Sequence, residues 1–310
     1  MKIAIIGTGV MGSAIIASLI REEVFTPSKI IAVDVDGKKL GGLKRKFGVK
    51  TEKSIHDATK EAEIILLAVK PQSLKIVCHN WRGDKPIVSI LAGVRMATLK
   101  KITGSKKIVR VMPNTPAQVG MGVSGWIASK AVTKSEKVLV RKILESFGET
   151  AEVKNENMLD IITAISGSGP AYFFAFAEAL EEAAKKIGLG KLSTAFVGGT
   201  FFGAAKLADT SEIPFAKLRE NVTSKGGTTA AALAVFEKAG LKKIVTRAVF
   251  AAKKRAEELG KGKIDFGGMG KTVNYHRDIG SDSFREPPTG GRETDLCSSL
   301  ALVRSLQAHL

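Results

Sequence analysis

Cysteine and histidine are scarce in this chain, with two and four residues among 310. Cys78 and Cys297 stand at no spacing that suits a metal site, and two cysteines give no disulfide framework. A chain without such a framework is typical of a reducing compartment. We therefore expect no bound metal and a cytoplasmic location.

Familiar hydrolytic arrangements are missing as well. His56 and His79 lie outside the loops expected to bind ligands, and no Ser-His-Asp arrangement or pair of catalytic carboxylates stands out. A reduction whose acceptor already carries its proton needs no such base. A protonated cyclic imine is an acceptor of this kind, because one hydroxyl hydrogen-bonded at its nitrogen would suffice.

Long apolar runs are absent too. No stretch approaches the roughly 18 consecutive apolar residues that predict a membrane-spanning helix. The apolar start is interrupted by Gly7, Gly9 and Gly12 and followed by charges at 21–23, which argues against a signal peptide. With 44% hydrophobic residues, we predict a soluble protein of about two domains and no membrane partner.

Acidic residues are outnumbered by basic ones, 30 against 48, and the formal net charge is +18. The basic residues are scattered along expected helices, as at Lys38 and Lys39, with no aromatic platform among them. This pattern favours a solvated basic surface that attracts small anions, and we expect no nucleic-acid partner. A nucleic-acid-binding or nucleotide-sensing protein remains the alternative, and retention on heparin at physiological salt would distinguish it.

A glycine-rich turn follows the first apolar run. Residues 2–6 are predicted to form a strand, and an apolar helical pattern follows the turn, which consists of Gly7, Thr8, Gly9, Val10, Met11 and Gly12. A strand, a G-x-G-x-x-G turn and a helix in this order bind the pyrophosphate of a dinucleotide. Gly7 would permit the tight turn, Gly9 the approach of the pyrophosphate, and Gly12 the packing of helix on strand. A turn that binds nothing is the alternative.

An acidic residue ends the second predicted strand, residues 29–33. Asp34 stands 22 residues after Gly12, where an acid hydrogen-bonds a ribose 2′-hydroxyl. Its carboxylate would repel a 2′-phosphate and favours NADH, whereas Lys38, Lys39 and the basic surface favour NADPH. The predicted cofactor is therefore NADPH or NADH.

Further strands at 64–69, 87–90 and 107–111 alternate with helical patterns. This alternation predicts a mostly parallel, doubly wound sheet within residues 1–155. Ligands bind such sheets at the strand ends, where the first of these strands ends with Ala68 and Val69 and the loops contain Lys70, Pro71, Ala92, Gly93 and Asn114. For Lys70 and Asn114, ligand binding and ordinary turn chemistry are equally good interpretations.

The second half is predicted to be all-helical. Strand signals end near residue 155, and the first turns of one helix, at Tyr172, Phe173, Phe174 and Phe176, are apolar on every side. Such a helix should be covered on every side. Dimerisation would cover it, and the alternative is a monomer with a fully internal helix.

A loop over 221–229 combines hydroxyls, two glycines and the start of a helix at Ala230. Exposed N–H groups at a helix N-terminus suit an anion. A plain turn with Thr228 or Thr229 as the helix N-cap is the alternative.

Five segments together resemble the pyrroline-5-carboxylate reductase family. They are G-T-G-V-M-G (7–12), A-V-K-P (68–71), V-M-P-N-T-P (111–116), S-G-S-G-P-A-Y (166–172) and E-N-V-T-S-K-G-G-T-T (220–229). Many dehydrogenases share the first, whereas the last two at this separation are specific to the family. The resemblance runs from Met1 to about Lys261.

This resemblance implies a reaction and an assembly. Members of the family reduce 1-pyrroline-5-carboxylate to L-proline with NAD(P)H, and their helical domains interlock as homodimers, which in some members assemble into rings. Each active site lies between the nucleotide domain of one subunit and the helical domain of its partner. The implied fold is α/β plus all-α: a Rossmann-like domain over 1–155 and a helical substrate-binding and dimerisation domain over 156–261.

The resemblance also implies roles for single residues. The substrate carboxylate would be held by Ser224, Gly226, Gly227 and Thr228, and Thr229 matches the catalytic threonine near the imine nitrogen. Because other members often have alanine at position 228, the two threonines could exchange roles. The loops 68–71, 91–93 and 112–115 would shape the nicotinamide pocket.

Two points stay apart from the resemblance. Residues 262–310 do not fit it, and we expect a disordered or non-native tail, with a small docking helix as the alternative. A two-domain 3-hydroxyacid dehydrogenase is the second enzyme interpretation. Such enzymes rely on a helix lysine after a glycine-rich segment, and residues 170–176 contain none.

Overall fold

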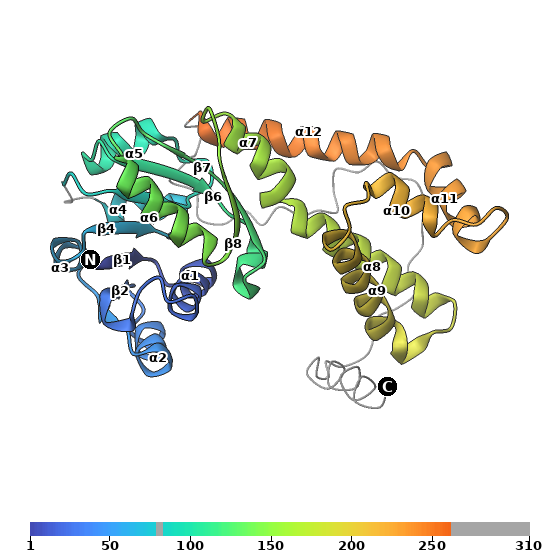
Figure 1. The fold of residues 1–310 in the computed structure, drawn as a ribbon, viewed down its shortest axis with the longest axis horizontal. Coiled ribbons are helices and arrows are strands. Elements are labelled where there is room, and N and C mark those ends of the chain that lie inside the picture. The colour runs from blue at the N-terminus through green and yellow to red at the C-terminus, as the bar shows by residue number, and fades with distance from the viewer. Residues whose placement is uncertain (79–82, 262–310) are drawn as a thin grey trace. The chain divides into compact units, whose positions relative to one another are not determined.

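The computed structural model describes residues 1–78 and 83–261 (Figure 1). The predicted tail 262–310, His79 and Cys297 lie outside the described residues. Residues 1–171 and 240–261 form one compact unit, and residues 172–239 form another. The compact units divide between residues 171 and 172, and the domain boundary at 155/156 stays a prediction.

Eight strands form a single sheet in the first unit. They are β1 (Ile3–Ile6), β2 (Ile30–Val33), β3 (Lys50–Glu52), β4 (Ile64–Leu67), β5 (Ile87–Ser89), β6 (Ile108–Met112), β7 (Gly122–Ala128) and β8 (Gly148–Glu152). The spatial order is β3-β2-β1-β4-β5-β6-β7-β8. All neighbouring strands pair in parallel except β6 and β7, which are antiparallel. The mostly parallel doubly wound sheet is confirmed, and its first six strands have the Rossmann order.

Three strands, β3, β7 and β8, were not predicted from the sequence. The β3 segment, Lys50-Thr51-Glu52, has no apolar residue, and β8 carries two glutamates in its five residues. Two glycines interrupt the apolar pattern of β7. These strands form because neighbouring strands offer them hydrogen-bonding edges. The local sequence pattern does not indicate such an edge.

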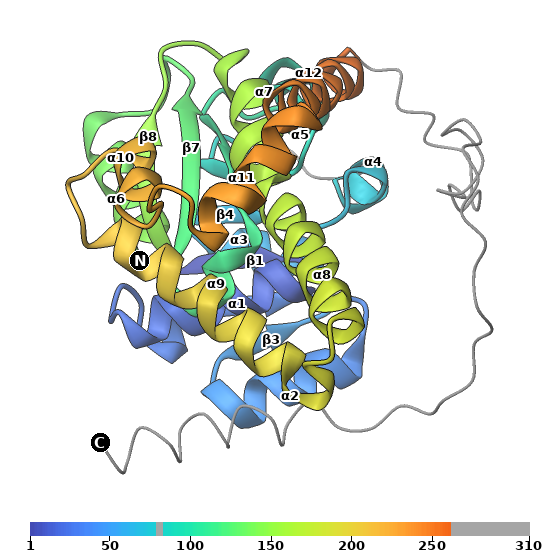
Figure 2. The same cartoon turned by 90° about the vertical axis from the view of Figure 1, so that its right-hand side faces the viewer.

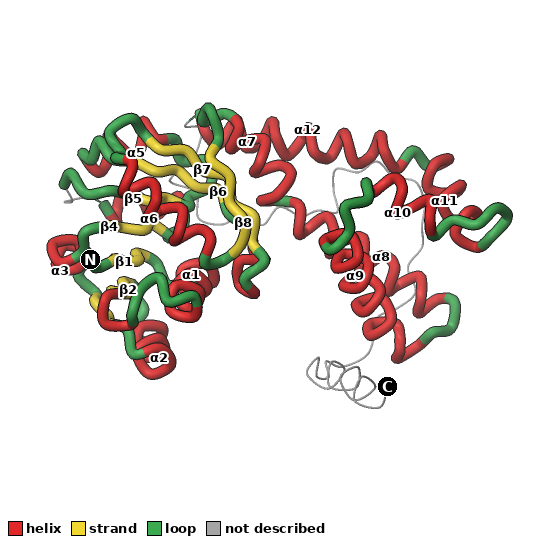
Figure 3. The backbone as a smooth tube through the Cα atoms, viewed as in Figure 1, coloured by secondary structure: helices red, strands yellow, loops and turns green. Residues whose placement is uncertain are grey.

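Helices cover both faces of the sheet (Figure 3). One face packs against α1 (Val10–Arg21), α2 (Gly37–Phe47) and α6 (Lys134–Glu145), and the other against α3 (Ile55–Glu61), α4 (Leu74–Val77) and α5 (Met96–Thr103). Successive strand residues point to opposite faces, so Ile3 and Ile5 join the first core while Ala4 and Ile6 join the second. Burial on both faces explains the uninterrupted apolar runs of β1, β2 and β4.

The end of the described chain returns to the first unit. The helices α7 (Met158–Ile162) and α8 (Gly169–Lys186) are joined by η4 (Thr163–Gly167), a single π-helical turn. The long helix α12 (Leu241–Gly260) packs against α7 and η4, and the two helices lie side by side in Figure 2. Near its end, a Cβ added to Gly93 would lie 2.8 Å from the Cβ of Leu259. This packing is the reason that α12 belongs to the first compact unit although it lies far along the chain.

The second unit contains the remainder of α8 with η5 (Gly190–Leu192), α9 (Ser193–Asp209), α10 (Phe215–Asn221) and α11 (Thr228–Lys238). Within residues 172–239 only Ala184, Ser193 and Val197 are buried. Phe173 and Phe174 on α8 remain 60% and 63% exposed. A unit with so little core of its own needs an external apolar cover.

Candidate active site

The glycine turn between β1 and α1 has the geometry that a pyrophosphate needs. Gly7 has φ +98°, and a Cβ there would lie 2.8 Å from the backbone of Ala68. A Cβ on Gly12 would collide with the carbonyl oxygen of Gly7. Gly9 is exposed, and a Cβ there would meet nothing within 4 Å. Two of the three glycines are therefore required by the protein itself, whereas the third leaves room for a ligand.

The N-terminus of α1 opens onto that room. Gly9 is the N-cap residue, no side chain caps the helix, and the first turn carries no acidic residue. Val10 is exposed and Met11 is half-buried in this turn. Free N–H groups together with the helix dipole favour an anion at this position. The residues thus fit the pyrophosphate of a dinucleotide.

Asp34 and Thr8 form a clasp between the glycine turn and the end of β2. The Thr8 backbone N–H and hydroxyl both donate to Asp34 Oδ2 at 2.8 Å, and the Asp36 N–H donates to Oδ1 at 3.0 Å. Thr8 is buried, so it holds the turn from within. Partial burial raises the pKa of Asp34, but the hydrogen bonds from Asp36 and Thr8 outweigh that effect and the pKa lies below its ordinary value. Asp34 is therefore a carboxylate at neutral pH.

The other predicted strand-end residues lie along the same edge of the sheet. Ala68 and Val69 are half-buried beside Gly7, and Lys70 is an exposed N-cap of the short 3₁₀ turn that starts at Pro71. Ala92 is half-buried just after β5, the strand next to β4. Because parallel strands end at a common edge, these loops lie along one edge of the sheet, where ligands bind in folds of this kind.

Asn114 follows β6 and uses its side-chain amide within the protein. Its Nδ2 donates to Ser166 Oγ at 3.1 Å, and its Oδ1 accepts the Val123 N–H at 2.8 Å. From the sequence, ligand binding and turn chemistry are equally good interpretations of Asn114. The structure gives it a bridging role, and a cofactor contact stays a prediction.

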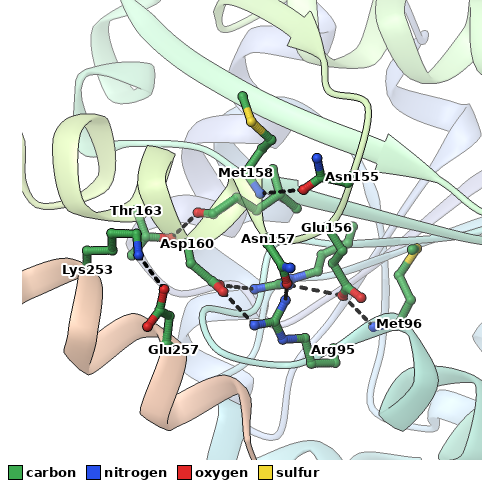
Figure 4. A network of polar contacts seen from close by, with 12 residues as sticks. Arg95, Met96, Asn155, Glu156, Asn157, Met158, Asp160, Thr163, Lys253 and Glu257 are labelled. Atoms are coloured by element: carbon green, nitrogen blue, oxygen red, sulfur yellow. Dashed lines mark hydrogen bonds and ion pairs between the residues drawn. The ribbon is translucent and has the colours of Figure 1, made fainter.

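Figure 4 shows a network of charged side chains around α7 that is not indicated by the sequence motifs. Arg110 on β6 and Asp160 on α7 have side chains only 3% and 2% exposed and lie 3.5 Å apart. Arg95 contacts Asp160 at 2.5 Å, and Glu156 contacts Arg110 at 3.0 Å. An arginine inside the apolar run of β6 was the available signal, because a buried charge needs partners.

The predicted carboxylate loop lies in the second unit. The N-cap of α11 is Gly227, with no side-chain cap, so neither Thr228 nor Thr229 caps the helix. Gly226 has φ +72°, and the Gly227 N–H donates to the Ser224 carbonyl at 3.1 Å. Ser224, Gly226 and Thr228 are exposed and Gly227 and Thr229 are half-buried. The loop thus presents hydroxyls and an uncapped helix N-terminus, which suit a carboxylate.

The described part of the chain contains no candidate metal site and no reactive thiol. Among these residues, no group of three or more His, Cys, Asp or Glu side chains could hold a metal ion. Burial raises the pKa of the Cys78 thiol to about 12. Cys78 is therefore a core residue and not a nucleophile.

Single alanine substitutions in the glycine turn should separate ligand binding from folding. We expect Gly9→Ala to weaken NADPH binding by about tenfold or more while the melting temperature stays within about 2 °C, because the added Cβ occupies only ligand space. Gly12→Ala should lower both the NADPH affinity and the melting temperature, since its Cβ collides with Gly7. Nicotinamide fluorescence titration and thermal melts measure the two effects. Wild-type affinity in Gly9→Ala would exclude this turn as the pyrophosphate site.

The fold and these loops define a dinucleotide-dependent oxidoreductase with a separate helical unit. Two family profiles match the chain: pyrroline-5-carboxylate reductase dimerisation over residues 156–259, and NADP oxidoreductase, coenzyme F420-dependent, over residues 2–93. The chain belongs to the pyrroline-5-carboxylate reductase family.

Individual relatives agree over nearly their whole lengths. The pyrroline-5-carboxylate reductase of Synechocystis is 38% identical over 265 residues, which covers 84% of this chain and 99% of the relative. The solved structure from Coxiella burnetii has a TM-score of 0.77 and 36% identity, covering 83% of this chain and 98% of the other. The Plasmodium falciparum structure with NADP bound has a TM-score of 0.72 and 32% identity, covering 84% and 98%.

Proposed function

We propose that this protein reduces 1-pyrroline-5-carboxylate to L-proline, with the hydride supplied by bound NAD(P)H. The observation that carries the proposal is the 224–229 loop, which presents hydroxyls and a helix N-terminus without a side-chain cap, in a chain that also has a dinucleotide turn. Its N–H groups and hydroxyls match the carboxylate of the substrate. A cytoplasmic location, expected from the cysteine content, is part of the same proposal.

Some residues of the chain bind the cofactor and the substrate carboxylate, and others orient the imine. The N–H groups after Gly9 hold the pyrophosphate, and Asp34 binds the adenosine ribose. Ser224, Gly226, Gly227 and Thr228 hold the substrate carboxylate, while the Thr229 hydroxyl hydrogen-bonds the imine nitrogen. The imine is already protonated, so the chain needs no strong general base, and most of the rate comes from positioning.

We propose that the active unit is a homodimer whose partner covers the apolar helices. The elements α7, η4 and α8 together form one helical run, Met158–Lys186. By length and composition alone this run could cross a membrane, and only 22% of its most apolar window is buried within the chain. The match of residues 156–259 to a dimerisation domain supports a partner subunit as the cover. The partner would then contribute its 224–229 loop to the nucleotide unit.

Asp34 is proposed to favour NADH over NADPH, because an ionised carboxylate repels a 2′-phosphate. Replacing it with serine should raise the NADPH-to-NADH ratio of kcat/KM by about tenfold or more, equivalent to about 1.4 kcal/mol. Asp36→Ser is the matched control, since serine retains the N-cap of α2 that Asp36 provides. A wild-type enzyme that clearly prefers NADPH would overturn this assignment.

Purified protein with each reduced nicotinamide, with and without 1-pyrroline-5-carboxylate, tests the reaction. Oxidation that depends on the imine and yields L-proline is the expected result. No turnover with either cofactor, in protein shown to be folded and dimeric, would overturn the proposed function.

A further inference from the structure

One face of β6 supports α7 and the π-turn η4. Side chains two residues apart on a strand share a face, and two residues of β6, together with Asn114 just beyond its end, meet the segment 160–167. Arg110 pairs with Asp160, Met112 lies against Gly167, and Asn114 binds Ser166. The contacts run from the middle of β6 to its carboxyl end, where the cofactor loops lie.

Close packing fixes how near the segment lies to the sheet. A Cβ on Gly167 would collide with Met112 Cε, and a Cβ on Gly125 of β7 would collide with Ile162 Cδ1. Inside this contact the helix widens into the π-turn η4, where the Ser168 N–H donates to the Thr163 carbonyl at 2.8 Å. Such turns are rare and frequent at functional sites.

A ring of three hydrogen bonds closes the end of β6. Asn114 Oδ1 accepts the Val123 N–H, Ser166 Oγ donates to the Val123 carbonyl at 3.4 Å, and Asn114 Nδ2 donates to Ser166 Oγ. Proline has no N–H, so Pro113 cannot extend the ladder between β6 and β7 beyond Met112 and Gly125. The Asn114 side chain takes over the pairing with Val123 and adds η4 to it.

The geometry points to Asn114 and Ser166 as a pair of positioning residues, which hold the 112–115 loop and the π-turn η4 in the one arrangement that hydride transfer needs. This inference rests on the proposed function. Ser166 acts through Asn114 and Val123. Because each member of the ring is held by the other two, loss of either side chain releases the same loop.

Removal of the ring is expected to reduce turnover more than cofactor affinity. Ser166→Ala and Asn114→Ala should each lower kcat by about 10- to 100-fold, the cost of a loop displaced by about an ångström. The dissociation constant for NADPH, measured by nicotinamide fluorescence, should change less than about threefold, since the pyrophosphate is bound at α1. Ser166→Thr keeps the hydroxyl and should restore most of the activity.

Two controls separate positioning from general stability. Thr150→Ala removes a hydroxyl that donates to the carbonyl of Ser124, next to Val123 but outside the ring, and should leave kcat unchanged. The kcat of the double variant Asn114→Ala/Ser166→Ala should be no lower than that of the less active single variant, because the effects of coupled residues do not add. Hydrogen exchange at the Val123 amide in the cofactor-free protein should quicken in both single variants.

The outcomes distinguish the inference from the function on which it rests. An inactive wild-type enzyme would overturn the proposed function, and Val123 exchange unchanged in Ser166→Ala would overturn the ring. Additive losses of kcat in the double variant, or a wild-type kcat in Ser166→Ala, would overturn the coupling between Asn114 and Ser166. A weakened NADPH affinity in Asn114→Ala alone would make Asn114 a direct cofactor ligand instead.

Discussion

Replacing Thr229 with alanine is expected to lower kcat by about 10- to 1000-fold, the range between loss of one oriented hydrogen bond and imprecise placement of the substrate. Thr229 is the second residue of α11 and is half-buried beside the uncapped helix N-terminus. Its hydroxyl is the group proposed to hydrogen-bond the imine nitrogen. Steady-state kinetics with saturating NAD(P)H and varied 1-pyrroline-5-carboxylate measure the effect.

Thr228→Ala is the informative comparison, because Thr228 is assigned to the carboxylate. Loss of uniform binding raises KM, whereas loss of an interaction made in the transition state lowers kcat. We therefore expect Thr228→Ala to raise KM with kcat nearly preserved. Thr210→Ala, which removes an exposed hydroxyl that donates to the Lys206 carbonyl, should change neither. A large fall in kcat for Thr228→Ala with none for Thr229→Ala would show that the two threonines have exchanged roles.

Replacing Asp160 with alanine is expected to lower the free energy of unfolding by about 3–5 kcal/mol, the usual cost of removing one partner of a buried ion pair. The change leaves the guanidinium of Arg110, only 3% exposed, with Glu156 as its remaining carboxylate partner in the network, and it leaves Arg95 with its hydrogen bond to Asn157 but without its ion pair. Urea denaturation at one fixed protomer concentration measures it, because stability of a dimer depends on concentration.

The matched control removes an aspartate from an exposed ion pair. Lys206 and Asp209 lie 2.8 Å apart with both side chains 54% exposed. Asp209→Ala should cost no more than about 1 kcal/mol, since water screens an exposed pair. Equal and small losses for Asp160→Ala and Asp209→Ala would mean that the buried network does not stabilise the joint between β6 and α7.

Local sequence patterns were sufficient for the parts of this protein that depend on neighbouring residues. Continuous apolar runs predicted β1, β2, β4, β5 and β6, and the glycine spacing located the turn at α1. Gly12 is required by the carbonyl of Gly7 within the same turn, whereas Gly7 is required by its φ of +98° and by the backbone of Ala68, which follows β4. The family motifs then supplied the reaction, because they are short segments whose residues act together.

The tertiary structure decided the features that depend on distant residues. The polar strands β3 and β8 exist through edges offered by other strands, and α12 joins the first unit through contacts with Gly93 and α7. Arg110 and Asp160 stand 50 residues apart, and Asn114 and Ser166 stand 52 apart. Sequence alone cannot pair such residues, since a buried charge or amide finds its partner only when the chain has folded. The sequence by itself therefore determined the fold class and the chemistry, while the packing against β6 decided which residues hold the site in place.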